Sequence, residues 1–112
     1  MVDIDKAWIA GLFEGEGCIY KDPRFNAIRL TLNSTDKDII DRLHAIVQCG
    51  NVRFVKFPEY KKHYKPAWCW TVWKAKVVKR LLVIMLPFLG ERRAYHALNA
   101  LDTLELDKKR PV

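Results

Sequence analysis

The stretch that decides the fold is residues 8–17, WIAGLFEGEG, in which an apolar segment ends in two carboxylates and closely spaced glycines. Its period predicts a helix over about residues 6–15, started by Asp5 and ended by Gly17. One side of this helix has mainly small residues, which let another backbone approach closely. We expect this side to form a dimer interface through Ala7, Ala10, Gly11, Glu14 and Gly15.

The bulk composition predicts one soluble domain over residues 1–112. Half of the residues are apolar, and the net charge of +7 indicates a polyanionic partner or a generally basic surface. The three cysteines are widely spaced, so we expect buried free thiols in a reducing compartment. No signal peptide or membrane span is recognisable, so we expect an intracellular protein of the cytoplasm, nucleoid or an organelle matrix, without a membrane partner.

The remaining pattern predicts an α+β domain with two hairpins. Alternating residues predict four strands and longer periods predict the helices between and after them, with a frayed tail over 107–112. The strands are expected at 18–21, 27–33, 51–57 and 67–74, and the later helices at 36–48, from 76 to Pro87, and 91–106. Hairpin connections make the sheet antiparallel, with helices on one face and the other face exposed.

Basic residues concentrate in the strands and their loops. Residues 51–80 contain nine Lys or Arg against one acid, Glu59. An exposed basic sheet can read a DNA groove, although a solvated basic surface and an RNA-binding or ribosomal protein are alternatives. Trp70 is equally compatible with the core. The candidates for DNA contact are Lys21, Arg24, Arg29, Thr31, Arg53, Lys56, Lys61, Lys62, Lys65, Trp70 and Lys74.

The acidic helix end suggests metal chemistry next to this basic surface. Phosphodiester cleavage uses a divalent cation bound by hard oxygen ligands. Glu16 offers a carboxylate, and Gly15 a backbone carbonyl at the helix terminus. The alternative is that Glu14 and Glu16 are simply solvated acids. One chain supplies too few ligands for a complete shell, so phosphates and waters would have to complete it.

Several stretches of the chain together resemble a known family. IAGLFEGEG at residues 9–17 resembles the signature of the LAGLIDADG homing endonucleases, with one motif copy as in the homodimeric type. LTLNSTDKDII at 30–40, GNV at 50–52 and LPFLGERR at 86–93 are similar to later blocks of that family, in the same order. The resemblance implies an αββαββα unit whose saddle-shaped, four-stranded antiparallel sheet lies in the major groove.

The resemblance also implies roles for individual residues. Glu16 matches the metal-binding, catalytic carboxylate, although the family more often has Asp there. Glu14 matches the acid that supports the helix end. Asn33 falls at or beside a polar position that orients active-site water, and Arg92 near a basic position that stabilises the phosphate or its water.

The function implied is a site-specific double-strand DNA endonuclease that acts as a homodimer on a near-palindromic target. Mg²⁺ is the implied cofactor; Mn²⁺ is expected to substitute, and Ca²⁺ to bind without supporting cleavage. The alternative is a family member without cleavage activity, acting as an RNA-splicing maturase or a DNA-binding regulator. Intron RNA is then a second candidate partner. The sequence is compatible with a gene inside an intron, an intein or a free-standing gene.

Overall fold

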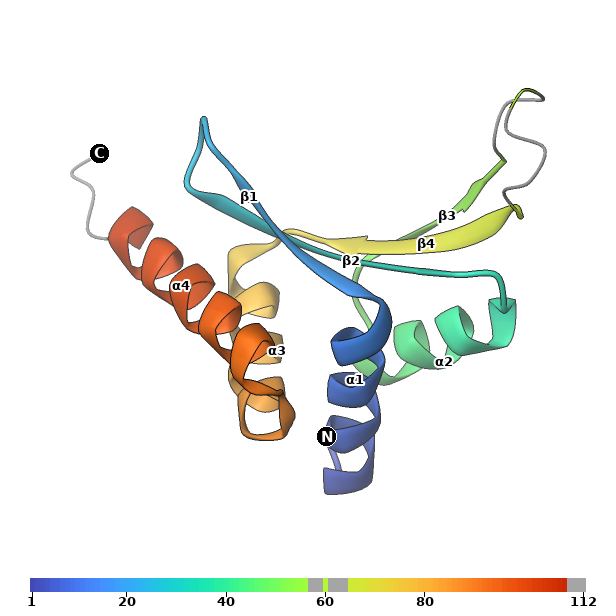
Figure 1. Cartoon of the computed structure of the whole chain (residues 1–112), viewed down its shortest axis with the longest axis horizontal. Helices are drawn as coiled ribbons and strands as arrows, with labels where there is room; N and C mark the ends of the chain where they lie inside the picture. The colour runs from blue at the N-terminus through green and yellow to red at the C-terminus, as the bar shows by residue number, and fades with distance from the viewer. Residues whose placement is uncertain (57–59, 61–64, 109–112) are drawn as a thin grey trace.

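The computed structural model describes residues 1–56, 60 and 65–108, with side chains described as far as residue 105. The predicted order of helices and strands is confirmed (Figure 1). The elements are α1 (Asp3–Glu16), β1 (Gly17–Asp22), β2 (Ala27–Ser34), α2 (Lys37–Val47), β3 (Asn51–Val55), β4 (Ala67–Val72), α3 (Ala75–Met85), the 3₁₀ turn η2 (Leu86–Phe88) and α4 (Glu91–Lys108).

Helix α1 begins earlier than the sequence predicted. Val2 occupies the N-cap position, so Asp5 lies in the first turn together with Asp3 instead of capping the helix. Acidic side chains in the first turn interact favourably with the positive end of the helix dipole. The two aspartates therefore stabilise the start of α1 without a capping hydrogen bond.

The four strands form one antiparallel sheet in the order β1-β2-β4-β3. The pairing register places β2 and β4 at the centre. Leu32 of β2 is opposite Gly17 of β1 on one side and Trp70 of β4 on the other. All the helices pack on one face of this sheet, and the two hairpins curve away from them at either end, so that the open face is shaped like a saddle (Figure 1). The predicted antiparallel sheet with helices on one face and the predicted saddle shape are both confirmed.

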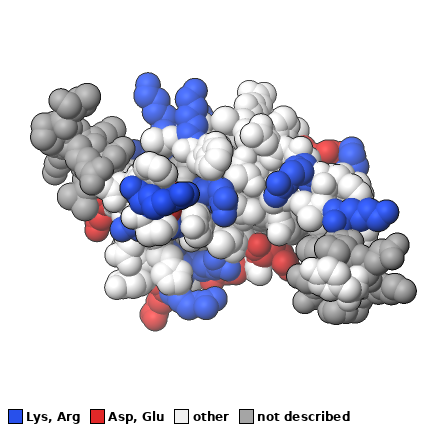
Figure 2. All heavy atoms as spheres, turned by 90° about the horizontal axis from the view of Figure 1, so that it is seen from above, with Lys and Arg blue, Asp and Glu red and all other residues white. Residues whose placement is uncertain are grey.

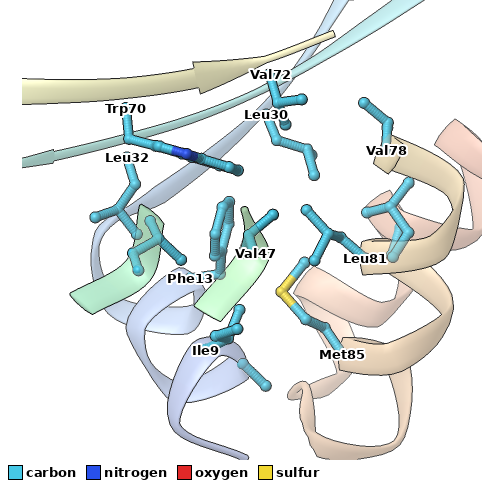
Figure 3. Packing of buried hydrophobic residues seen from close by; sticks show 14 of the residues in the cluster. Ile9, Phe13, Leu30, Leu32, Val47, Trp70, Val72, Val78, Leu81 and Met85 are labelled. Atoms are coloured by element: carbon cyan, nitrogen blue, oxygen red, sulfur yellow. The ribbon is translucent and has the colours of Figure 1, made fainter. Parts of the chain in front are cut away.

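The core lies between the sheet and the helices. Ile28, Leu30 and Leu32 alternate along β2 and are all buried on the helix-covered face. Phe13 of α1 meets the Trp70 ring edge-on, with ring centroids 6.1 Å apart (Figure 3). Such an edge-to-face contact adds roughly 0.5–1.5 kcal/mol to the burial of the two rings.

Trp70 corrects one sequence prediction. Its side chain is fully buried, and its indole N–H donates to the Cys49 carbonyl at 2.9 Å. Trp70 is therefore a core residue and cannot contact DNA from the open face. The alternation along β4 separated Trp70 from Thr71 correctly, but Trp73, directly after β4, continues the opposite side, so hydrophobicity did not identify the inner face.

Within residues 1–56, 60 and 65–108, none of the helices combines the length and hydropathy that a bilayer span requires. Cys18, Cys49 and Cys69 are free thiols, but of these only Cys69 is buried, whereas Cys49 is partly buried and Cys18 is exposed.

We predict that Gly50→Ala destabilises the fold. Gly50 has a φ of 102°, and a Cβ atom there would lie 2.4 Å from Trp70 Nε1. Backbone strain and displacement of the indole should together lower the free energy of unfolding by about 2 kcal/mol or more. Urea denaturation measures this change. Asn51→Ala, at the adjacent exposed position, is the control and should change stability by less than about 0.5 kcal/mol; equal effects of the two substitutions would contradict the steric argument.

Candidate nucleic-acid interface

The open face of the sheet carries the side chains that alternate with the buried ones. Because Leu30 and Leu32 point to the helices, Arg29, Thr31 and Asn33 point to the open face. Pairing extends this set to the neighbouring strands, which contribute Cys18, Tyr20, Asn51, Arg53, Cys69 and Thr71. The face is therefore polar and basic, with the Tyr20 ring from β1 and the Trp73 ring, which follows β4 and lies beside Arg29.

A row of short polar side chains crosses the middle of this face. Thr31 pairs with Cys18 on β1 and with Thr71 on β4, and Thr71 pairs in turn with Asn51 on β3. Arg29 lies on one side of the row, and Arg53 lies on the other, opposite Cys69. Guanidinium, hydroxyl and amide groups are the side-chain groups that hydrogen-bond base edges in the major groove.

Part of the hydrogen-bonding capacity of this face is unused. Among the described residues, Arg29 Nε and Thr31 Oγ1 are buried atoms without a hydrogen-bond partner. The Arg29 guanidinium lies over the Tyr20 ring at 4.6 Å from its centroid, a cation–π contact that orients it. Polar groups of this kind are normally satisfied in native proteins, so these two atoms are exceptions on a face that is otherwise open.

The charge distribution on the open face suits a polyanionic partner. Lys and Arg are spread across the face seen from above, whereas Asp and Glu appear mostly near its rim (Figure 2). Of the predicted DNA-contact residues, those that are exposed are Lys21, Arg24, Arg53, Lys56, Lys65 and Lys74. Lys61 and Lys62 lie outside the described residues.

Lys21 corrects a second prediction. It is paired with the buried Ile28, so its side chain belongs to the helix-covered side of the hairpin. There it lines a hollow against α4, together with His96 and Asn99. Lys21 was assigned to the open face because it is basic and in a strand, but the alternation of β1 places Tyr20 there instead.

The structure brings Glu16 and Asn33 together. Both line a hollow of about 410 Å³ at the junction of α1 with the β2–α2 connection, next to Ser34 and Asp36. Gly17 makes this junction tight, because its N–H bonds the Phe13 carbonyl and a Cβ atom there would lie 2.3 Å from the Phe13 ring. Helix α1 thus passes directly into β1 and leaves the exposed Glu16 at the edge of the open face.

Glu14 and Arg92 lie elsewhere. Glu14 precedes Glu16 by two residues, which turns its side chain to a different side of α1. A Cβ atom on Gly90 would lie 2.7 Å from Glu14 Oε1, so Glu14 faces the start of α4. Arg92 is exposed in the first turn of α4 and does not line the hollow of Glu16 and Asn33.

The small-residue side of α1 is open in part. Ala7, Gly11 and Gly15 are exposed. A Cβ atom added to either glycine would meet no heavy atom of the described residues within 4 Å, apart from the adjacent backbone of α1 itself. Ala10 corrects the predicted interface, since it is fully buried in the core of its own chain. The pattern placed Ala10 on the small side, but small residues also occur where a helix packs against its own sheet.

The donor set fits a divalent cation only as a partial shell. Glu16 supplies a carboxylate, and carbonyls of the last helical turn, Gly15 included, lack onward helical partners. The described residues contain no group of three or more His, Cys, Asp or Glu able to hold a metal. Hard oxygen ligands of this kind suit Mg²⁺, which commonly binds through one or two carboxylates and substrate phosphates.

Sequence reasoning missed several residues of this surface. Tyr20, Asn51 and Thr71 were not assigned to DNA contact, although each alternates with a residue on the helix side. The missing information was which face of each strand is buried. Only the pairing with Leu30 and Leu32 determines this for β1 and β4.

Comparison with known proteins agrees with the geometry. A family model described as a LAGLIDADG-like domain matches residues 3–49. The homing endonuclease I-CvuI in complex with the I-CreI target aligns with a TM-score of 0.71 and 20% identity, over 95% of this chain and 69% of that chain. The homing endonuclease I-TnaI aligns with a TM-score of 0.70 and 15% identity, over 93% and 74%. The group I intron-encoded homing endonuclease I-CeuI, complexed with DNA, aligns with a TM-score of 0.72 and 12% identity, over 96% and 56%. No curated protein sequence matches the chain.

We predict a low pKa for the Asp22 carboxyl at the tip of the β1–β2 hairpin. The Arg24 backbone N–H donates to Asp22 Oδ1 at 2.8 Å, and the Arg24 side chain adds a second hydrogen bond, so both lower the pKa of Asp22. Any resulting stability is present above the unfolded-state pKa and is lost as the pH falls through the folded-state pKa. In Arg24→Ala, the Asp22 pKa measured by carboxyl NMR titration should rise only partly toward its ordinary value, because the backbone donor remains. Lys37→Ala should leave it unchanged; full reversion in Arg24→Ala would contradict the dominant role of the backbone.

Proposed function

We propose that this chain, which belongs to the LAGLIDADG family by its match over residues 3–49 and its fold, is a site-specific endonuclease for double-stranded DNA. One observation carries the proposal: the exposed Glu16 carboxylate shares a hollow with Asn33 at the edge of a basic, polar sheet face. A metal-binding group is thereby placed next to a surface suited to a polyanion.

The open face would bind the duplex in its major groove. Lys and Arg side chains would contact phosphates and supply most of the affinity, while Arg29, Thr31 and Arg53 would contact base edges. The fold relatives I-CvuI and I-CeuI were solved in complex with DNA, which supports a duplex as the partner of this face.

The residues at the helix end would prepare the reaction. Glu16 and the Gly15 carbonyl would hold Mg²⁺, and Asn33 would orient a water molecule or phosphate oxygen through its side-chain amide. A divalent cation bound there would neutralise charge that develops on the phosphate and make water a better nucleophile. I-CvuI was solved on DNA with Mg and with Ca, which supports a divalent metal. Arg92 lies outside this hollow, at the start of α4, which Glu14 faces. We therefore assign Arg92 a contact with a DNA phosphate from that side of α1.

A homodimer would complete the site. Ala7, Gly11 and Gly15 form an open side of α1 on which a second α1 could pack at close range. Two copies would bring two Glu16 carboxylates near each other, one for each strand of a near-palindromic target. Each chain alone supplies only part of a metal shell, which supports an assembly in which DNA and a second chain provide the rest.

We predict that Glu16→Gln abolishes cleavage and retains binding. The amide keeps the size of the side chain but removes the charge that would hold the metal, so cleavage should fall by roughly 100-fold or more. Incubation with a randomised duplex library in Mg²⁺, followed by sequencing of the ends, measures cleavage, and gel shift in Ca²⁺ measures binding.

Glu14→Gln is the matched control on the same helix end. It should retain most cleavage, because Glu14 faces the start of α4 rather than the hollow. Specific binding by the wild type without cleavage in Mg²⁺ or Mn²⁺ would overturn the nuclease proposal and favour a binding protein such as a maturase or regulator.

We predict that Gly11→Leu disrupts the dimer and leaves the protomer folded. The added side chain points into open space in one chain but would hold two α1 helices apart. Sedimentation velocity should show a dimer for the wild type and a monomer for the variant at equal concentration, with unchanged circular dichroism. Ala45→Leu, at an exposed position of α2, is the control and should remain dimeric. A monomeric wild type, with and without DNA, would contradict the homodimer.

A further inference from the structure

A hollow at the tip of the β1–β2 hairpin differs in chemistry from the rest of the open face. It encloses about 370 Å³, at the lower end of the roughly 300–1,000 Å³ typical of ligand pockets. Its lining includes three aromatic and three charged side chains, which together define what we call the aromatic hollow. These are Tyr20, Phe25, Trp73, Asp22, Arg24 and Arg29.

The three rings come from separate places in the chain. Tyr20 lies in β1, Phe25 in the turn before β2, and Trp73 directly after β4. They are 43%, 62% and 66% exposed, respectively, although rings of this size are usually covered. Their convergence on one hollow therefore calls for a partner with an aromatic or apolar surface.

Two guanidinium groups stand against these rings. Arg29 lies 4.6 Å from the Tyr20 centroid, and Arg24 lies 5.2 Å from the Phe25 centroid. Asp22 holds Arg24 in place by accepting hydrogen bonds from its backbone and side chain. Arg29 Nε is buried and has no hydrogen-bond partner among the described residues. The hollow thus combines stacking surfaces with fixed cations.

An intact duplex does not offer what this hollow can bind. Paired bases expose their edges in the grooves and keep their faces stacked on one another. Aromatic side chains instead stack on bases that have left the helix or belong to a single strand, and nearby Arg side chains bind their phosphates. The chain's net charge of +7 favours the same class of partner.

We propose that the aromatic hollow binds an unpaired nucleobase of a single nucleic-acid strand, stacked on Trp73 or Tyr20, with Arg24 at an adjacent phosphate. This site lies beyond the proposed duplex cleavage and does not depend on Glu16. The base can belong to single-stranded DNA or RNA, since each offers the same ring face and phosphate.

The test measures binding of fluorescein-labelled oligonucleotides by anisotropy, at a salt concentration that suppresses contacts to phosphate alone. The probes are oligodeoxyuridine, oligouridine and a mixed-sequence duplex. Trp73→Ala should weaken binding of a single strand by roughly 5- to 150-fold, the range found for one base–aromatic stack. It should change duplex binding much less. Trp73→Phe should restore most of the affinity, because a stacking ring is retained.

Tyr95→Ala is the matched control, since Tyr95 is an equally exposed ring on α4, at 65%. It should leave single-strand binding unchanged, as should Glu16→Gln, so that failure of the cleavage proposal is distinguished from failure of this one. Tighter binding of oligouridine than oligodeoxyuridine would identify RNA as the source of the base, and the reverse would identify DNA, because these two probes differ only in the 2′-hydroxyl. Absence of single-strand binding, equal losses in Trp73→Ala and Tyr95→Ala, or an equal loss of duplex and single-strand binding in Trp73→Ala would overturn the site.

Discussion

The contact between Phe13 and Trp70 connects the motif helix to the centre of the sheet, and the placement of the candidate site depends on it. Gly17 leaves room for the Phe13 ring, and Gly50 leaves room for the Trp70 indole. Leu32 is opposite both Gly17 and Trp70, so the end of α1 and the two central strands are held in one register. Glu16 and Asn33 directly flank this register, which explains why they share a hollow although 17 residues separate them in the sequence.

The same register separates the two faces of the sheet. Leu30 and Leu32 are buried, so the residues that alternate with them must be open, and a shift of one residue would exchange the two sets. Burial of the apolar set is therefore the force that presents Arg29 and Thr31 outward. The basic face thus depends on the stability of the core behind it.

Much of the fold was predictable because its elements have strong periods. The alternation of residues 27–33 and the apolar stripe of 36–48 predicted β2 and α2 to within one residue at either end. The errors concern residues whose chemistry fits two environments. Trp70 is apolar enough for a core and polar enough for an interface, and Ala10 suits both a homotypic helix contact and an internal one. Composition could not decide these cases, whereas pairing with neighbouring strands and packing on the helices decide them in the structure.

The two proposed sites can be related by the length of one strand. Strand β1 begins directly after Glu16 and ends at Asp22 in the aromatic hollow. Its six residues span about 20 Å at roughly 3.4 Å per residue. Bases along a nucleic-acid strand are also spaced by about 3.4 Å, so this length corresponds to about six nucleotides. A duplex on the open face with its scissile phosphate near Glu16 would reach the hollow about six base pairs away, toward the outer end of a half-site. Paired bases there would remain stacked, so the hollow could be filled only if a strand left the duplex at this distance. The two proposed sites would therefore bind different conformations of nucleic acid, paired beside Glu16 and unpaired beside Trp73.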